Sequence, residues 1–270
     1  MDDSKKIFRE ERLAMMYRII QEKHKVFVVD LAEQFNISES SVRLDLAELE
    51  TRNLILRTHG GAILKDEITD NKVVIDLDSI NDRITHLQKE KDAIARKTAS
   101  LINDGDTIMI DGGSTTKMVA KYLSDKKNLT VITNSIILIP DFLYNPNINL
   151  YSLGGLAQKD HGVCVGYMTD EFVAQFHPQK TILGIDGISL DKGLTAANPS
   201  VPAVSTVKRK MIEVSDQLII VADHSKLNRI CLMPVAPIDA MDILVTDSGA
   251  PRDFIVQIEQ KGPRVIVAEC

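Results

Sequence analysis

One short run of glycines and hydroxyl residues carries the clearest chemical pattern in this chain. The run is Asp111-Gly112-Gly113-Ser114-Thr115-Thr116, and it follows an expected strand at residues 107–110 and precedes an expected helix. Glycines let backbone amides converge, hydroxyls add donors, and a helix N-terminus favours negative charge, so a phosphate or carboxylate fits this turn. The run is neither a P-loop nor a G-x-G-x-x-G motif, and a strand-to-helix turn without a ligand is the alternative interpretation.

Polar residues follow several other expected strands, and a parallel sheet gathers such residues at one edge. They are Thr133, Asn134, Gly154, Gly155, Asp186, Asp223 and Lys226. An anion cradle beside two carboxylates and a lysine suits a phosphorylated polyol. Asp111 would repel a phosphate, so we expect its carboxylate to brace the loop or to accept hydroxyl hydrogens from a sugar. An exposed Asp223–Lys226 ion pair, which contributes little energy, is equally consistent with the sequence.

Residues near the N-terminus suit contact with a nucleic-acid duplex. An expected helix that begins after Ser38 presents small polar residues and Arg43 outward, and a glycine turn follows it. The order of helix, tight turn, helix and two short strands is typical of a winged helix-turn-helix. A small helical interaction domain with a solvated polar face is the alternative. The candidate DNA contacts are Ser38, Ser40, Ser41, Arg43, Arg52, Arg57, His59 and Gly60.

Apolar residues at helical spacing indicate the elements that position this first group. We predict a helix over residues 7–22, a short strand over 26–29, and a second helix capped by Asp30. Asn36 tolerates the left-handed turn that must follow, and Ser38 can cap the third helix. Two short strands joined by a glycine turn then form the wing.

In the remainder of the chain, short apolar strands alternate with helices. The expected strands are residues 107–110, 129–133, 149–153, 181–185, 218–222, 243–245 and 265–267. The expected helices are residues 89–102, 116–123, 136–142, 170–176, 203–214 and 253–261. This alternation predicts an α/β fold in which a mostly parallel sheet is covered on both faces.

The length of 270 residues is more than one ordinary hydrophobic core needs, which favours two domains. We predict a DNA-binding domain over residues 1–65, a polar linker over 66–85, and an effector-binding domain over 86–270. Residues 1–65 contain 11 basic and 11 acidic side chains, so the remainder holds the whole net charge of −6. A neutral head attracts phosphate weakly, so we expect a dimer or tetramer that binds paired half-sites.

Several other classes of protein are disfavoured. We find no signal peptide and no membrane span, so we expect a cytoplasmic protein without a membrane partner. Three cysteines at unpaired spacing indicate neither a disulfide framework nor a zinc site. No nucleophile elbow or metal-ligand spacing occurs, so we expect no catalytic residue, metal or cofactor. A carboxylate and a lysine beside a sugar phosphate keep a sugar-phosphate isomerase with an accessory N-terminal module as the alternative.

The chain resembles the DeoR family of bacterial sugar-metabolism regulators over nearly its whole length. The stretches that carry the resemblance are VDLAEQF (29–35), SESSVRLDLAEL (38–49), LRTHGGA (56–62), DGDTIMIDGGSTT (104–116), VITNS (131–135), Gly154-Gly155 and ADHSK (222–226). The resemblance implies a winged helix-turn-helix followed by a sensor domain similar to ribose-5-phosphate isomerase. It implies a transcription factor, usually a repressor, that binds a phosphorylated sugar or related metabolite.

The sequence departs from the family pattern at two places. Leu44 stands where the recognition helix of the family usually has a second arginine, which removes a cation from the face toward DNA. Val204, Ser205 and Thr206 stand where the family often has a glutamate before the helix around Lys208, which argues against retained isomerase catalysis. The resemblance thus implies a regulator of carbohydrate-metabolism genes, rather than an enzyme, with double-stranded operator DNA and a phosphorylated sugar as partners.

Overall fold

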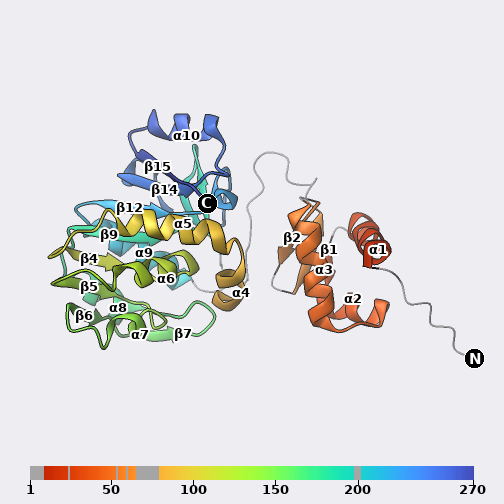
Figure 1. The fold of residues 1–270 in the computed structure, drawn as a ribbon, viewed down its shortest axis with the longest axis horizontal. Coiled ribbons are helices and arrows are strands. Elements are labelled where there is room, and N and C mark those ends of the chain that lie inside the picture. The colour runs from red at the N-terminus through yellow and green to blue at the C-terminus, as the bar shows by residue number, and fades with distance from the viewer. Residues whose placement is uncertain (1–8, 24, 53, 59, 65–78, 198–201) are drawn as a thin grey trace, which may run out of the picture. The chain divides into compact units, whose positions relative to one another are not determined.

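The structure is a computed structural model, and it describes residues 9–23, 25–52, 54–58, 60–64, 79–197 and 202–270. The chain divides into two compact units, residues 1–72 and 73–270, whose elements are labelled in Figure 1. The predicted linker, residues 66–85, lies outside the described residues as far as residue 78. None of the described helices is long and apolar enough to span a bilayer.

The first unit is a winged helix-turn-helix, as the sequence predicts. Its elements are α1 (Arg9–Lys23), β1 (Lys25–Phe27), α2 (Val28–Phe35), α3 (Glu39–Thr51), β2 (Ile55–Thr58) and β3 (Gly61–Leu64). The two wing strands join the short first strand in one sheet of order β1-β3-β2. Side chains from the three helices and the sheet share one buried core, which includes Leu13, Met16, Leu31, Leu46 and Ile55.

Local turn chemistry agrees with the prediction at two of three positions. Asn36 adopts a φ of 50°, the left-handed conformation predicted for the turn between α2 and α3. The Ser38 side chain caps α3 by accepting a hydrogen bond of 3.2 Å from the Ser41 amide. The prediction that Asp30 caps α2 is wrong. The helix begins at Val28, directly after β1, so Asp30 lies in its first turn.

The second unit is built on one seven-stranded sheet of order β15-β14-β12-β9-β4-β5-β6. Its strands are β4 (Thr107–Ile110), β5 (Leu129–Thr133), β6 (Ile148–Ser152), β9 (Lys180–Gly184), β12 (Leu218–Val221), β14 (Ile243–Asp247) and β15 (Arg264–Ala268). Each of the seven matches a predicted strand. All neighbouring pairs are parallel, so the carboxyl ends of the strands lie along one edge of the sheet.

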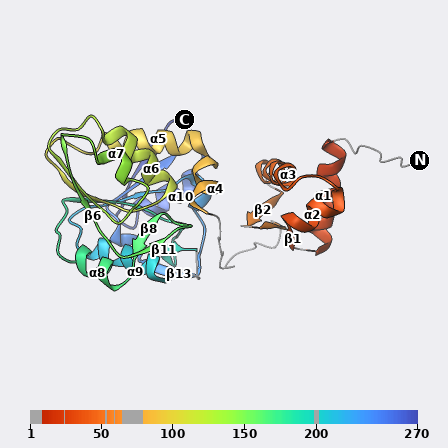
Figure 2. The same cartoon turned by 90° about the horizontal axis from the view of Figure 1, so that it is seen from below.

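Helices cover both faces of this sheet and complete the predicted α/β fold (Figure 2). They are α4 (Ile80–Thr85), α5 (Gln88–Ala99), α6 (Ser114–Leu123), α7 (Ile139–Phe142), α8 (Tyr167–Val173), α9 (Pro202–Glu213) and α10 (Arg252–Glu259). Helices α5, α6 and α7 bury Ile94, Val119 and Phe142 in a core on one face. Helices α8, α9 and α10 bury Val173, Met211 and Phe254 in a core on the other face.

Two small antiparallel sheets and helix α4 have no counterpart in the prediction. The strands are β7 (Leu156–Gln158) with β8 (Val163–Val165), and β10 (Gly187–Ser189) with β11 (Gly193–Ala196) and β13 (Met233–Ala236). These strands are too short to show a hydrophobic period. Helix α4 occupies the end of the predicted linker. Ile80 is buried there, and its amide donates a hydrogen bond of 2.7 Å to the Asp160 carbonyl, so α4 packs as part of the second unit.

We predict that Gly61→Ala destabilises the first unit, because a Cβ at Gly61 would lie 1.6 Å from the Val26 carbonyl oxygen in the neighbouring strand. The strands would have to separate, which costs roughly 1–3 kcal/mol. Gly60→Ala is the matched control, since its Cβ would meet nothing nearer than a Phe27 ring carbon at 3.8 Å. Urea unfolding followed by circular dichroism compares the two variants. Equal stability of both would contradict the close approach of β1 and β3.

Candidate functional site

The N-terminus of α3 brings three of the predicted DNA contacts together. The Ser38 hydroxyl lies 2.8 Å from the Ser40 hydroxyl and 2.9 Å from the Ser41 hydroxyl. Ser38 and Ser40 are exposed, and Ser41 is half-buried. These hydroxyls form a compact group at a helix N-terminus, where the backbone favours negative charge. A phosphate oxygen of a duplex fits such a group.

Two predicted DNA contacts, Arg43 and Arg52, are exposed and each pairs with an acidic residue four positions earlier. Arg43 Nη2 lies 3.1 Å from Glu39 Oε2, and Arg52 Nε lies 3.0 Å from Glu48 Oε1. Exposed pairs of this kind are weak, so a phosphate or a base edge can replace the carboxylate. Leu44, beside Arg43, is the most exposed large apolar side chain of α3. The outer face of α3 therefore combines one guanidinium with one apolar side chain.

The wing places two further predicted contacts beside the helices. Arg57 is half-buried in β2, and its amide donates a hydrogen bond of 3.2 Å to Glu50 Oε1 on α3. The Gly60 carbonyl accepts a hydrogen bond of 2.5 Å from the Val28 amide, which ties the turn of the wing to α2. His59 lies outside the described residues.

Asp45 on α3 belongs to the recognition-helix stretch that resembles the DeoR family, but the sequence analysis did not assign it a positioning role. It is buried, and its carboxylate oxygens lie 3.2 Å from Arg9 Nε and 2.6 Å from Arg12 Nε on α1. This double ion pair fixes the recognition helix against α1 from the side opposite its exposed face. The available signal was an acidic residue on the inward stripe of α3, between the buried Val42 and Leu49.

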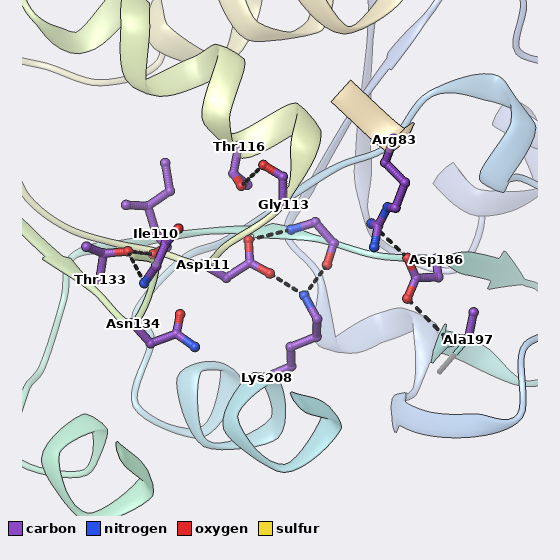
Figure 3. Close-up of polar contacts among 12 residues, drawn as sticks. Arg83, Ile110, Asp111, Gly113, Thr116, Thr133, Asn134, Asp186, Ala197 and Lys208 are labelled. Carbon is purple, nitrogen blue, oxygen red and sulfur yellow. Dashed lines mark hydrogen bonds and ion pairs between the residues drawn. The ribbon is translucent and has the colours of Figure 1, made fainter. Parts of the chain in front are cut away.

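Asp111 lies among buried charges at the carboxyl edge of the parallel sheet (Figure 3). Its Oδ1 accepts a hydrogen bond of 3.0 Å from the Gly184 amide at the end of β9. Its Oδ2 pairs with the ammonium of Lys208 from α9, which also donates a bond of 2.8 Å to the Gly184 carbonyl. Burial raises the pKa of Asp111, and the Lys208 charge opposes that rise. Asp111 is therefore placed to brace β4 against β9 and α9.

The glycine and hydroxyl run forms the turn from β4 into α6. Ser114 and Thr115 are buried in the first turn of the helix, and the Thr116 hydroxyl donates a bond of 3.1 Å to the Gly113 carbonyl. Gly112 has no room for a side chain, because a Cβ there would lie 2.1 Å from Val163. The first amides of a helix have no partner within it, so those of α6 are directed toward this turn. Geometrically, the turn is suited to an anion.

Thr133 and Asn134 follow β5 next to this turn (Figure 3). The Thr133 hydroxyl donates a bond of 2.6 Å to the Ile110 carbonyl and accepts one of 3.0 Å from the Ser135 amide. Asn134 Nδ2 donates a bond of 2.9 Å to the Cys164 carbonyl, while its buried Oδ1 has no hydrogen-bond partner among the described residues. Thr133 thus fastens two strand ends, and Asn134 retains an unused acceptor.

Asp186 follows β9 and is held by helix α4. Its Oδ1 lies 3.1 Å from Arg83 Nη2, and its Oδ2 accepts a hydrogen bond of 3.1 Å from the Ala197 amide. Burial alone would raise the pKa of Asp186, but Arg83, Lys226 and Lys208 together hold this pKa well below its usual range. Asp186 therefore stays ionised and lies within reach of three cations.

Asp223 follows β12 and caps the 3-10 turn η2 (His224–Lys226). It is buried, and its Oδ1 accepts a hydrogen bond of 3.1 Å from the Ser225 amide and contacts the Ser225 hydroxyl. Burial alone would raise the pKa of Asp223, but attraction to Lys226 and the Ser225 hydroxyl lower it. Lys91 of α5 faces the same group, and burial lowers the pKa of Lys91 to about 8 against the attraction of Asp223.

Basic side chains from outside the strand ends are the main feature that the sequence analysis missed. Lys91 Nζ donates hydrogen bonds of 2.5 Å to the Arg83 and His86 carbonyls, which fastens α4 to α5. Burial lowers the pKa of His161, and the charges of Arg83, Asp186 and Lys208 act on it as well. His161 therefore lies close to this group. The sequence did not indicate that these helical lysines and arginines belong to the site, because a helix face exposed to solvent contains the same residue types.

Gly154 and Gly155 have no described contact with these charges. They follow β6 at the outer edge of the sheet, and both are exposed. The Gly154 carbonyl accepts a hydrogen bond of 2.7 Å from the Thr169 hydroxyl of α8. Gly155 has a φ of 149°, and a Cβ there would lie 2.1 Å from the same hydroxyl. The pair thus shapes the turn from β6 into β7.

We define the rim cluster as the residues Arg83, Lys91, Asp111, Asp186, Lys208, Asp223 and Lys226. It holds four basic and three acidic side chains, and an additional anion would balance its charge. A surface hollow of about 660 Å³ lies elsewhere, along β11 and β13, and its lining includes no rim residue. We place the candidate ligand site at the rim, because the buried charges and the unused Asn134 acceptor converge there.

Family sequence models match both units. The model of the "DeoR-like helix-turn-helix domain" matches residues 12–67, and that of the "DeoR C terminal sensor domain" matches residues 87–248. The fold and these matches define a DNA-binding transcription regulator with an α/β sensor domain. The chain belongs to the DeoR family of transcriptional regulators.

Relatives of this chain carry matching names. The transcriptional repressor AccR of Agrobacterium fabrum is 35% identical over 93% of this chain and 94% of its own length. The HTH-type transcriptional repressor GlcR of Bacillus subtilis is 33% identical over 97% of this chain and 98% of its own length. The glycerol-3-phosphate regulon repressor of Escherichia coli is 33% identical over 86% of this chain and 88% of its own length.

A solved structure of D-ribose-5-phosphate isomerase in complex with phospho-erythronic acid overlaps 53% of this chain and 55% of its own. The TM-score is 0.38 and the sequence identity 17%, a likeness too low to support an argument about activity. The relatives matched over most of their length are named as repressors, so the comparisons do not favour the isomerase alternative.

We predict that Lys208→Met destabilises the second unit by about 3–5 kcal/mol near neutral pH, because it leaves the Asp111 carboxylate buried without its cation. Burial raises the pKa of Asp111, so this carboxylate takes up a proton more readily in the folded protein than in the unfolded chain. The destabilisation caused by Lys208→Met should therefore become smaller as the pH falls toward 4. Urea unfolding at several pH values measures this dependence.

Two variants control that measurement. Lys210→Met removes a lysine from the same helix but breaks only an exposed pair with Glu213, so it should leave stability nearly unchanged. Adding Asp111→Asn to Lys208→Met removes the buried charge and should restore part of the loss. A Lys208→Met variant as stable as Lys210→Met at neutral pH would contradict the buried ion pair.

Proposed function

We propose that the chain is a cytoplasmic repressor of a carbohydrate-metabolism operon, controlled by a phosphorylated sugar or related anionic metabolite bound at the rim cluster. The observation that carries this proposal is the convergence of four basic side chains, from α4, α5, α9 and η2, beside a glycine and hydroxyl turn. Figure 3 shows two of them, Arg83 and Lys208, with the carboxylates of Asp186 and Asp111. Their charge exceeds that of the three carboxylates, and a ligand phosphate would balance it. One relative is named for a glycerol-3-phosphate regulon, which supports this ligand class.

The ligand phosphate is best accommodated at the N-terminus of α6, on the amides of Gly113, Ser114 and Thr115. The Thr116 and Thr133 hydroxyls already donate within the protein, so their part is to hold the cradle in shape. Sugar hydroxyls would be read by acceptors at the strand ends, among them Asn134 Oδ1, Asp186 and Asp223. Lys226, close to two of these carboxylates, would neutralise the ligand.

The ion pair of Arg83 with Asp186 provides a route from the ligand to the rest of the chain. Arg83 belongs to α4, the first described element after the segment that leads from the DNA-binding unit. A phosphate can compete with Asp186 for the guanidinium, since arginine binds carboxylate and phosphate in the same way. A ligand that binds the two arrangements of α4 unequally would shift the balance between DNA-competent and DNA-incompetent states.

On DNA, the exposed face of α3 is proposed to lie in the major groove. Arg43 suits the edge of a guanine, and Leu44 suits the methyl group of a thymine. Arg52, Arg57 and the serine group at the N-terminus of α3 suit phosphates of the backbone. The Leu44 position would therefore change which base is read rather than abolish recognition.

For the ligand, we predict that at least one phosphorylated sugar alters DNA affinity by about 5- to 150-fold. The DNA is a duplex selected by this protein from a random pool, and the panel contains hexose, pentose and glycerol phosphates with inorganic phosphate as reference. Lys226→Ala should lose the response while keeping DNA affinity, whereas Lys121→Ala, an exposed lysine on α6, should retain it. No response and no thermal shift with any compound would favour a DNA-binding scaffold whose second unit serves only assembly.

For DNA recognition, we predict that Arg43→Ala reduces preference for the selected duplex over random DNA by about 1–3 kcal/mol. Arg57→Ala should weaken binding to all sequences alike. It should also reduce the slope of log affinity against log salt concentration by about 1, because one phosphate contact is lost. Arg96→Ala, which removes an exposed arginine of α5 in the other unit, is the control. Fluorescence anisotropy at several salt concentrations measures all three. Unchanged preference in Arg43→Ala would contradict the assignment of α3.

A further inference from the structure

The turn of the β7–β8 hairpin holds His161 between two other elements. On one side of this residue, the Asp160 carbonyl accepts a hydrogen bond of 2.7 Å from the Ile80 amide of α4. On the other side, the Gly162 carbonyl accepts a hydrogen bond of 2.8 Å from the Ile136 amide, in the segment after β5. His161 itself is half-buried. Its backbone is therefore fixed where the hairpin meets α4 and the end of β5.

The same hairpin packs on the turn proposed to hold the ligand phosphate. A Cβ at Gly112 would lie 2.1 Å from a Val163 side-chain carbon, so β8 lies directly against the turn from β4 into α6. Asn134 is bound to β8 at two points. Its carbonyl accepts a hydrogen bond of 2.7 Å from the Cys164 amide, and its Nδ2 donates one of 2.9 Å to the Cys164 carbonyl. The hairpin therefore forms one wall of the candidate ligand site.

Charges from several elements act on the His161 ring. They are the cations Arg83 of α4 and Lys208 of α9, the carboxylate of Asp186 after β9, and the carboxylate of Asp160 in the same turn. Burial is the largest cause that lowers the pKa of His161, the two cations lower it further, and the two carboxylates oppose them. With these neighbours alone, the imidazole is neutral near neutral pH.

We propose that His161 is a further ligand-contacting residue of the rim site and that it takes up a proton when an anionic ligand binds there. This inference rests on the proposed function, which places the ligand among the same cations. A phosphate near Arg83 and Lys208 would offset their charges, and a negative charge close to the ring favours the imidazolium. The protonated ring can then donate a charge-assisted hydrogen bond to the phosphate. Anion binding and proton uptake therefore strengthen each other.

The proposal fixes the sign of the pH dependence. Because the ligand raises the proton affinity of His161, ligand affinity should increase as the pH falls through the pKa of the ligand-bound ring, and it should level off below the pKa of the free ring. Burial lowers the pKa of Lys91 to about 8, and a hydrogen bond to Asp247 raises the pKa of His224. These two groups also titrate near this range, so the test has to observe the His161 ring directly.

NMR of the histidine rings in the full-length chain tests the proposal from about pH 5 to 8, the range in which histidines titrate. The probe is sodium sulfate, whose charge is constant there, compared with sodium chloride at equal ionic strength. The signal missing from His161→Gln assigns the ring among the six histidines. Sulfate should raise the pKa of His161 by about one unit, which corresponds to about tenfold tighter sulfate binding at acidic pH. His177, exposed shortly before β9, is the matched control and should titrate alike in both salts.

A His161 pKa that is the same in sulfate and in chloride would overturn the proposal. Thermal melting in the two salts separates this result from the proposed function. If sulfate raises the melting temperature, Lys226→Ala abolishes that gain and the His161 pKa does not move, then the rim binds an anion and only the role of His161 is wrong. A His161 pKa raised by sulfate, together with no response to the panel of sugar phosphates, would contradict the proposed function and leave the anion contact of His161 intact.

Discussion

Charges buried at the end of a parallel sheet must be neutralised, and this constraint organises the second unit. Each of the three rim carboxylates has partners from a different element: α9 for Asp111, α4 for Asp186, and η2 for Asp223. An isolated carboxylate at these positions would be strongly disfavoured, so helices that lie far apart in the sequence are drawn to the same edge. The proposed anion site and the packing of the helices thus have one physical origin.

The same requirement shapes the DNA-binding unit on a smaller scale. The recognition helix has to present a fixed face to DNA, yet much of its outer surface is exposed and contributes little packing energy. Asp45 holds α3 in position against α1, because its buried carboxylate pairs with both Arg9 and Arg12 and a displacement of α3 would break these pairs. The outer guanidiniums of Arg43 and Arg52 are held only by weak surface pairs and remain exchangeable.

Features encoded within a few neighbouring residues could be predicted from the sequence, whereas those that depend on tertiary contact could not. The seven sheet strands, the left-handed turn at Asn36 and the Ser38 cap have local causes, and the structure contains all of them. Arg83 and Lys208 lie on helices, and a basic residue that faces solvent shows the same sequence pattern there as one that pairs with a buried carboxylate. The sequence around them therefore did not indicate that they contact Asp186 and Asp111. The predicted cap at Asp30 is wrong because α2 begins directly after β1 ends, two residues before Asp30.

The energies of the rim cluster limit how a ligand can act on it. The Arg83–Asp186 pair is partly buried, so breaking it without replacement leaves a poorly solvated carboxylate and works against an allosteric coupling that is typically only about 1–3 kcal/mol. A ligand that only drew Arg83 away from Asp186 would therefore bind weakly. A ligand whose phosphate takes Arg83 while its hydroxyl donates to Asp186 makes the exchange nearly balanced in energy. Inorganic phosphate lacks the second group, so recognition of the sugar hydroxyls and the shift of α4 would be parts of one event.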